Sequence, residues 1–380
     1  LASGDPSMSD RYWESGEASL AAIADSLYQK GLRSVAGSVF VDVSAWDSST
    51  VGPTWEVEDL RFSHGATGGA FAIDEGEISV IINAGPAVGS PANLEWLPKG
   101  TPDYVRTRIT TVPPDSGLQV RSNYLPETRH LELTGQIELY DTDTLTFALR
   151  DPVRQATAAL DIALEQAGIE LQGGAQVAWS EGYRVGRGCL SGSVRECPNA
   201  GPILTLESPP LSELIAGILK PSQNWMTEQL IRTLGAELGE EGSWSEGIVV
   251  ISEFLTEVVG IDSLDISPRD GSGLSAYNLV TPRALVRILQ YLSSNQSNGT
   301  YRSALATPGE EDSTLQERLS GLEGRVFAKT GTISNVNSLS GYLTRDDGSE
   351  VVFSILSNGS GLPAGQVRDA IDDIVRILAR

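Results

Sequence analysis

Two kinds of hydrophobic pattern divide the chain near its middle. Between about residues 78 and 150, short apolar segments are separated by glycine, proline and aspartate, and one of them alternates apolar and polar positions at Leu131, Leu133, Ile137 and Leu139. After residue 205, apolar residues recur at the spacing of one helix face, at Leu211, Leu214, Ile215, Ile218 and Leu219. These patterns predict a strand-rich first half and a helix-rich second half.

The first half is expected to contain two helices around its strands. The spacing predicts a helix over 17–30 and a strand over 35–44. A second helix is predicted over 152–168, where Asp151 is a cap candidate, Pro152 occupies the first turn and Gly168 ends the helix.

The second half is expected to alternate helices and then close with strands. Helices are predicted within 208–220 and, after Pro221, over 224–238, 246–260 and 281–293. Three strands are predicted next. The first lies at the start of the stretch 325–343, the second at 338–343 and the third at 351–357. The final helix is predicted over 364–380.

The change of pattern predicts a domain boundary near residue 205. At 380 residues and 40% hydrophobic content, the chain is long enough for two or three cores. We therefore expect one region over 1–205, with a β-rich sub-domain nested at about 78–135, and a second region over 206–380.

The charge balance excludes some classes of partner. The 27 basic and 50 acidic side chains give a formal net charge of −23, which argues against nucleic acid or an anionic membrane surface. No apolar run approaches the roughly 20 residues of a membrane helix, so we expect no transmembrane segment.

Histidine and cysteine usage narrows the candidate chemistry. His64 and His130 are the only histidines and neither has a nucleophile motif beside it, so we expect no histidine base, no metal and no cofactor. Cys189 and Cys197 lie eight residues apart; they are a disulfide candidate, which would imply an exported protein, although two free thiols fit equally well.

Lys329 is an unusual residue in a chain that has only four lysines and 23 arginines. Thr330, Gly331 and Thr332 follow it directly. A compact ammonium beside hydroxyls and a flexible backbone suits a site that binds an anion, and a glycine in a strand marks a bulge or a close approach by a ligand. The alternative is an exposed strand lysine before a turn.

A second candidate lies at the junction of two predicted helices. Ser222 and Asn224 form the pattern Ser-x-Asn between the helices on either side of Pro221. A lysine can replace histidine as a base when neighbouring positive charge and burial lower its pKa. The alternative is that Ser222 caps the following helix. A second Ser-x-Asn at Ser293 and Asn295 shows that the tripeptide alone is weak evidence.

Taken together, these motifs resemble those of a known family. The segments LKPSQNWMTEQLIRTLG, RDGSGLSAYNLVTPRALVRIL and FAKTGTISNVNSLSGYL occur in order, and they resemble the class C low-molecular-mass penicillin-binding proteins, which are D-alanyl-D-alanine carboxypeptidases and endopeptidases. The resemblance implies an α+β fold of the β-lactamase/transpeptidase type, with helices packed on an antiparallel sheet and inserted β-rich accessory domains. It assigns 1–205 to these accessory domains and 206–380 to the C-terminal part of the penicillin-binding catalytic domain. It also implies hydrolysis of peptidoglycan stem peptides through an acyl-enzyme.

The resemblance assigns roles to the residues of the predicted strand. Lys329 and Thr330 would hold the carboxylate of the terminal D-Ala, or that of an inhibitory β-lactam. Gly331 would let the strand lie close to substrate, and the backbone N–H of Thr332 would supply half of the oxyanion hole.

The Ser-x-Asn residues receive roles in the same way. Ser222 would relay a proton to the leaving amine, and Asn224 would hold the amide on the acyl side of the substrate. The resemblance further implies a secreted, periplasmic or cell-envelope location and no cofactor.

One element of the family pattern is missing from this chain. The nucleophile comes from Ser-x-x-Lys, but the residues three positions before the four lysines are Leu27, Trp96, Gly217 and Val326. The simplest interpretation is a copy that is incomplete at its N-terminus and lacks the first catalytic segment, so this polypeptide alone is expected to be inactive. The alternatives are a non-catalytic peptidoglycan-binding pseudoenzyme or scaffold and, less expected, a serine β-lactamase.

Overall fold

The computed structural model describes residues 2, 4–97, 105–125, 130–179, 202–295 and 298–380. The chain divides into two compact units, Leu1–Ser208 and Pro209–Arg380. This division falls three residues after the boundary predicted at 205. The role of the first unit as an accessory region stays a prediction, and the two units are described separately below.

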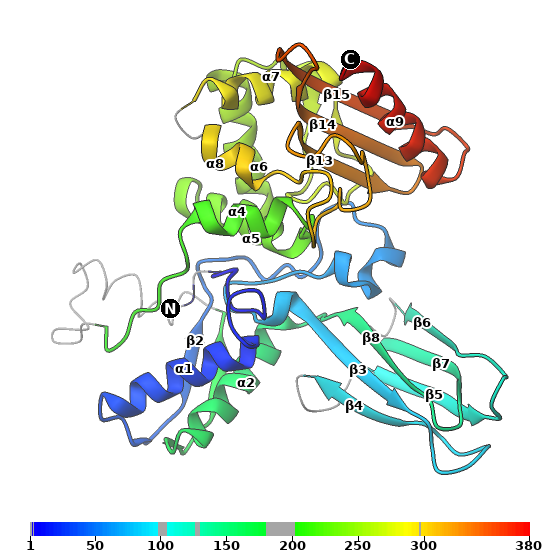
Figure 1. Cartoon of the computed structure of the whole chain (residues 1–380). Helices are drawn as coiled ribbons and strands as arrows, with labels where there is room; N and C mark the ends of the chain where they lie inside the picture. Colours follow the sequence, from blue (N-terminus) through cyan, green and yellow to red (C-terminus); the bar gives the residue numbers. More distant parts are fainter. Residues whose placement is uncertain (1, 3, 98–104, 126–129, 180–201, 296–297) are drawn as a thin grey trace. The chain divides into compact units, whose positions relative to one another are not determined.

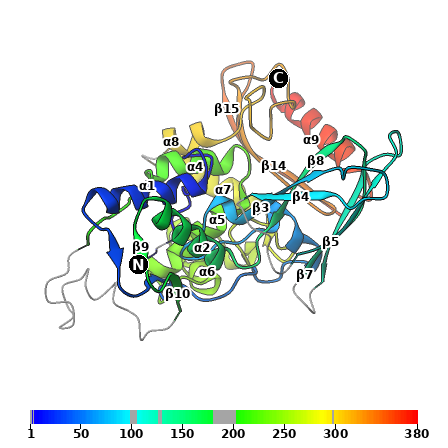
Figure 2. The ribbon, with the colours of Figure 1, turned by 90° about the horizontal axis from the view of Figure 1, so that it is seen from below.

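Two helices of the first unit pack side by side. They are α1 (Gly16–Gln29) and α2 (Pro152–Gln166), and both lie close together in Figures 1 and 2. As predicted, the carboxylate of Asp151 caps α2 by accepting a hydrogen bond from the Arg154 backbone N–H at 3.1 Å.

The strand predicted over 35–44 is broken into two short strands. These are β1 (Ser34–Val35) and β2 (Val39–Asp42). Each pairs in parallel with a segment that follows α2, namely β9 (Glu170–Leu171) and β10 (Ala175–Ala178). The break comes at Gly37, whose carbonyl accepts from the Gly173 N–H at 3.0 Å between the two pairings.

The remaining strands of the first unit form two three-stranded sheets. One has the order β4-β3-β8, with β3 at Glu77–Asn83, β4 at Asn93–Leu97 and β8 at Thr142–Ala148. The other has the order β5-β7-β6, with β5 at Val105–Val112, β6 at Gln119–Leu125 and β7 at His130–Glu138. Strand β7 alternates at Leu131, Leu133 and Ile137, which join one buried cluster with residues of β3, whereas the predicted Leu139 lies beyond the end of the strand. Short 3₁₀ turns occur at Val57–Arg61, Ser63–Gly65 and Asp74–Gly76.

The second unit begins with a series of helices. The predicted ones are α4 (Leu211–Leu219), α5 (Asn224–Leu238), α6 (Trp244–Glu253) and α7 (Pro282–Ser293), and α8 (Asn298–Ala304), which was not predicted, follows them. The helix predicted over 246–260 continues past α6 as a π-helical turn over Phe254–Val258. A 3₁₀ turn (Ser263–Asp265) and the short strand pair β11 (Ile266–Ser267) and β12 (Leu279–Val280) precede α7.

An antiparallel sheet closes the second unit. Its strands are β13 (Val326–Ile333), β14 (Val336–Thr344) and β15 (Glu350–Asn358), in that order, followed by α9 (Ala364–Leu378). Helix α9 covers one face through a cluster that includes Val326, Ala328, Val367 and Ile371. On the other face, Phe327 and Tyr342 pack with Leu289 of α7. This arrangement confirms the predicted fold, in which helices pack on an antiparallel sheet. Within the described ranges, we find no helix with the length and apolar character needed to cross a bilayer.

Candidate active site

The structure brings together Ser222 and Lys329, which are 107 residues apart in the sequence. The ammonium of Lys329 donates a hydrogen bond to the Ser222 hydroxyl at 2.7 Å and a second one to the Thr330 carbonyl oxygen at 2.8 Å. The contact joins the corner between α4 and α5 to the edge strand of the closing sheet.

The corner holds Ser222 in an uncommon backbone conformation. Its φ is +65°, a left-handed value that costs a residue with a side chain on the order of 1–2 kcal/mol. The cap of α5 is Gln223, whose side-chain oxygen accepts from the Met226 N–H at 3.1 Å. Because Gln223 caps the helix, the hydroxyl of Ser222 can accept the hydrogen bond from Lys329.

Strand alternation explains the direction of the Lys329 side chain. Val326 and Ala328 point toward α9, whereas Phe327 points to the opposite face, so Lys329 lies on the Phe327 side. There its ammonium is largely removed from water, and this burial lowers the pKa of Lys329 to about 8. Within the described part of the chain, no carboxylate pairs with this ammonium.

The outer edge of β13 presents backbone groups beside this lysine. The Ala328 N–H points away from β14, because it donates to the Ala306 carbonyl at 2.9 Å. Along each strand of an antiparallel pair, the N–H and C=O groups of successive residues point to opposite edges of the strand. The N–H groups of Thr330 and Thr332 therefore point to the same outer edge as that of Ala328. The Thr332 N–H is therefore directed away from β14, and its role as an oxyanion donor stays a prediction.

The space beside Gly331 is filled from within the sheet. A Cβ added at this position would come within 2.4 Å of the Ser338 hydroxyl, directly across from it on β14. This cross-strand contact accounts for a glycine here without any approach by substrate.

The other predicted residues are placed as follows. Asn224 is the first residue of α5, two positions after Ser222. His64 lies in the first unit and contacts Asp59 at 3.2 Å, and His130 begins β7. Cys189 and Cys197 lie outside the described residues, so their pairing stays a prediction.

The sequence did not indicate a buried carboxyl group near the site, that of Glu228. Glu228 lies one helical turn after Asn224 on α5, and it is 1% exposed. It accepts hydrogen bonds from the indole N–H of Trp244 at 2.7 Å and from the backbone N–H groups of Gly271 and Ser272 at 3.0 and 2.7 Å. Burial, aided by the charge of Asp270, raises the pKa of Glu228 to about 7. The only sequence signal is an acidic residue among the buried positions of a helix.

The geometry around Ser222 and Lys329 allows proton transfer and anion binding. A lysine whose pKa is about 8 loses its proton far more readily than an ordinary lysine, so it can exchange a proton with the Ser222 hydroxyl 2.7 Å away. In its charged form, an ammonium without a carboxylate partner favours an anionic ligand. The site can therefore bind an anion and move a proton next to it.

Comparisons with known proteins agree on one family. Residues 1–380 match the D-Ala-D-Ala carboxypeptidase 3 (S13) family. The D-alanyl-D-alanine carboxypeptidase of Actinomadura sp. (strain R39) is 30% identical, over 97% of this chain and 67% of that protein. The penicillin-sensitive carboxypeptidase A of Dictyostelium discoideum is 24% identical, over 99% of this chain and 72% of that protein.

The fold agrees with a solved structure. The crystal structure of penicillin binding protein 4 (dacB) from Haemophilus influenzae superposes with a TM-score of 0.78 at 21% identity. The match covers 98% of this chain and 81% of that one, and it shows the fold.

Proposed function

Because the chain belongs to the D-Ala-D-Ala carboxypeptidase 3 (S13) family, we propose that Ser222 and Lys329 form the substrate-binding wall of a serine D-alanyl-D-alanine peptidase site. The observation that carries the proposal is their 2.7 Å contact, in which a half-buried lysine has no carboxylate partner among the described residues. The ligand class is a peptide that ends in D-Ala-D-Ala, as in a peptidoglycan stem peptide.

The terminal carboxylate of this peptide is the anion that Lys329 binds. The ammonium and the Thr330 hydroxyl hold the carboxylate, which resolves the unfavourable burial of an unpaired charge. A β-lactam carries a carboxylate that can take the same place. The Thr332 N–H on the outer edge of β13 donates to the carbonyl oxygen of the scissile bond as negative charge develops there.

Ser222 and Asn224 act on the peptide bond itself. The Ser222 hydroxyl passes a proton between Lys329 and the amine of the departing D-Ala, and Asn224 holds the amide on the acyl side of the substrate. The 380 residues contain no Ser-x-x-Lys, so these residues supply binding and proton transfer, not the serine that forms the acyl-enzyme. A peptidoglycan substrate places this function in the secreted, periplasmic or cell-envelope space.

The proposal is tested by equilibrium binding with matched ligands. An N-acylated peptide ending in D-Ala-D-Ala is compared with its C-terminal amide, which lacks the anion. We expect the acid to bind at least about tenfold more tightly, since a charge-assisted hydrogen bond contributes on the order of 1.5–3 kcal/mol. Lys329→Met should abolish this preference, whereas Lys30→Met, which removes an exposed lysine, should retain it. Equal affinity for acid and amide would contradict the proposal.

A further inference from the structure

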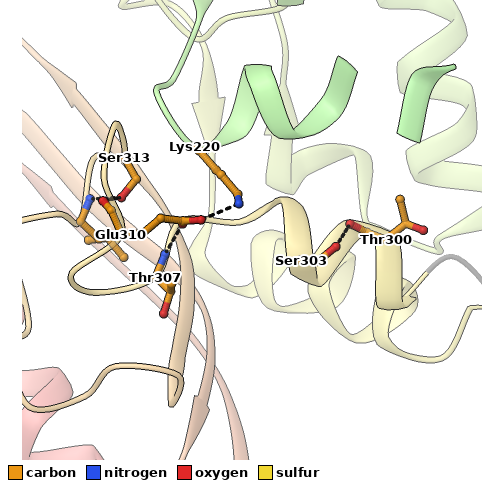
Figure 3. A network of polar contacts seen from close by, with 7 residues as sticks. Lys220, Thr300, Ser303, Thr307, Glu310 and Ser313 are labelled. Carbon is orange, nitrogen blue, oxygen red and sulfur yellow. Dashed lines mark hydrogen bonds and ion pairs between the residues drawn. The ribbon is translucent and has the colours of Figure 1, made fainter. Parts of the chain in front are cut away.

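An ion pair restrains the corner between α4 and α5, which contains Ser222. The Lys220 ammonium contacts a carboxylate oxygen of Glu310 at 2.5 Å, and both side chains are about one quarter exposed. Lys220 is the C-cap of α4, two residues before Ser222. Figure 3 shows the pair together with the hydrogen bonds that surround Glu310.

The segment that carries Glu310 reaches both halves of the site. At its start, the Ala306 carbonyl accepts from Ala328, the residue before Lys329. At its end, the Thr314 N–H donates to the Lys220 carbonyl at 3.0 Å. The segment 306–314 therefore connects the strand that bears Lys329 with the corner that bears Ser222.

Glu310 is itself held in place within this segment. Its second carboxylate oxygen accepts from the Thr307 N–H at 3.3 Å, and its backbone carbonyl accepts from the Ser313 hydroxyl at 3.0 Å. The carboxylate is thus aimed at Lys220 by local contacts.

Three features of the segment 306–314 are energetically unfavourable. The hydroxyls of Thr307 and Thr314 are buried without a hydrogen-bond partner in the described part of the chain, and Asp312 has a φ of +54°. Such features persist only when surrounding contacts outweigh their cost, and they gather at functional sites.

The left-handed backbone of Ser222 needs an external restraint for the same reason. The corner has two backbone restraints, from Thr314 N–H to the Lys220 carbonyl and from Gln223 N–H to the Ile218 carbonyl at 2.9 Å. The Lys220–Glu310 pair adds the side-chain restraint, and it is partly shielded from water, where an ion pair is less screened than at the surface.

We propose that Glu310 is a positioning residue which, through Lys220, holds the Ser222 hydroxyl against the Lys329 ammonium. This inference rests on the proposed function, because that function gives the Ser222–Lys329 contact its purpose. Glu310 contacts neither of the two residues that it positions, so its removal acts on the geometry of the corner. When the corner relaxes, water enters beside Lys329.

The experiment follows the four lysines by NMR in the full 380-residue chain, labelled at the lysine side-chain nitrogen, without any substrate. Lys220→Arg removes one signal and Lys329→Met another, which assigns the signals of these two lysines. In the unchanged protein, we expect the Lys329 signal to titrate with a pKa of about 8, because burial lowers it. Glu310→Gln and Lys220→Met should each raise this pKa by about one unit or more, because the ammonium regains water. Lys220→Arg keeps the ion pair and should leave it at about 8.

The direction of the shift separates positioning from a direct charge effect. In Glu310→Gln, removal of a nearby negative charge would by itself lower the pKa of Lys329, which is opposite to the expected change, so this variant separates the two effects. In Lys220→Met, removal of a positive charge would by itself raise the pKa of Lys329, so a rise there agrees with positioning but does not separate it from the charge effect. Asp373→Asn, which breaks the exposed pair with Arg376 on α9, is the control and should have no effect on Lys329.

A lower thermal midpoint in Glu310→Gln with an unchanged or lowered Lys329 pKa would overturn the proposal and leave the ion pair a purely structural role. If Glu310→Gln does not fold, Glu310→Asp shortens the reach of the carboxylate and should raise the Lys329 pKa in the same direction; no rise would equally overturn the proposal. Since no substrate is present, a negative result here leaves the carboxylate-binding proposal untouched.

Discussion

Replacing Lys329 by methionine should stabilise the second unit near neutral pH. Burial lowers the pKa of Lys329 from 10.5 to about 8. At about pH 7 the lysine is charged in both states, and the shift corresponds to a cost of about 3 kcal/mol, at 1.36 kcal/mol per pKa unit. Methionine has no charge to desolvate, but it loses the hydrogen bonds to the Ser222 hydroxyl and to the Thr330 carbonyl, which contribute about 1 kcal/mol each. The net expected gain is about 1 kcal/mol.

This gain should disappear at alkaline pH. Between about pH 8 and 10.5 the unfolded chain binds a proton at Lys329 that the folded chain does not, so the stability of the unchanged protein rises with pH across this window. By about pH 10 the remaining cost is about 1 kcal/mol, which is less than the two hydrogen bonds contribute. The unchanged protein should then be the more stable one, by about 1 kcal/mol.

Urea unfolding monitored by pulsed hydrogen exchange of peptides from β13 to β15 measures this difference for the second unit alone. Lys329→Arg is the matched control, since arginine stays charged at both pH values and should show no alkaline gain. Two results would contradict the claim that burial without a counter-ion lowers the pKa of Lys329. One is a methionine variant that is less stable than the unchanged protein at about pH 7, and the other is a difference in stability that does not change with pH.

Three further predictions concern the same unit. Ser222→Ala should lower the Lys329 pKa further, because the charged form loses an acceptor while burial persists; a rise measured by lysine NMR would contradict this. The folded-state pKa of Glu228, raised from 4.5 to about 7, should make the stability of the unit fall as pH rises from about 5 to 7, and Glu228→Gln should remove that slope in urea titrations; an unchanged slope would show that another group causes it. Incubation of the 380 residues with a fluorescent penicillin should give no covalent adduct by mass spectrometry, and an adduct would place a nucleophile within this chain.

Local sequence signals were sufficient for most elements of the fold. The cap of α2 at Asp151, the apolar stripe of α4 and the alternation of β7 are each determined by residues close in sequence. Each is present, except that Leu211 of the predicted stripe is exposed and Leu139 lies beyond the end of β7. The parallel pairing of β1 and β2 with β9 and β10 was not predicted, because it depends on partners that are more than 130 residues away and leaves no local pattern.

The candidate site shows the same limit. The motifs identified Ser222, Asn224 and Lys329, but spacing alone could not show that Gln223, not Ser222, caps α5 or that Ser222 has a left-handed backbone. Nor could it show that Ser338 fills the space beside Gly331. Each of these features depends on contacts between elements, which the packing of the second unit decides.

The Lys329 pKa in the presence of ligand is the most direct test of the carboxylate-binding claim. It is measured by side-chain nitrogen NMR, first in the free protein and then with a saturating N-acylated peptide ending in D-Ala-D-Ala. A bound carboxylate stabilises the ammonium, so the account predicts that the pKa rises from about 8 by about one unit or more, while the C-terminal amide produces no comparable rise. An unchanged Lys329 pKa with the acid bound would contradict it.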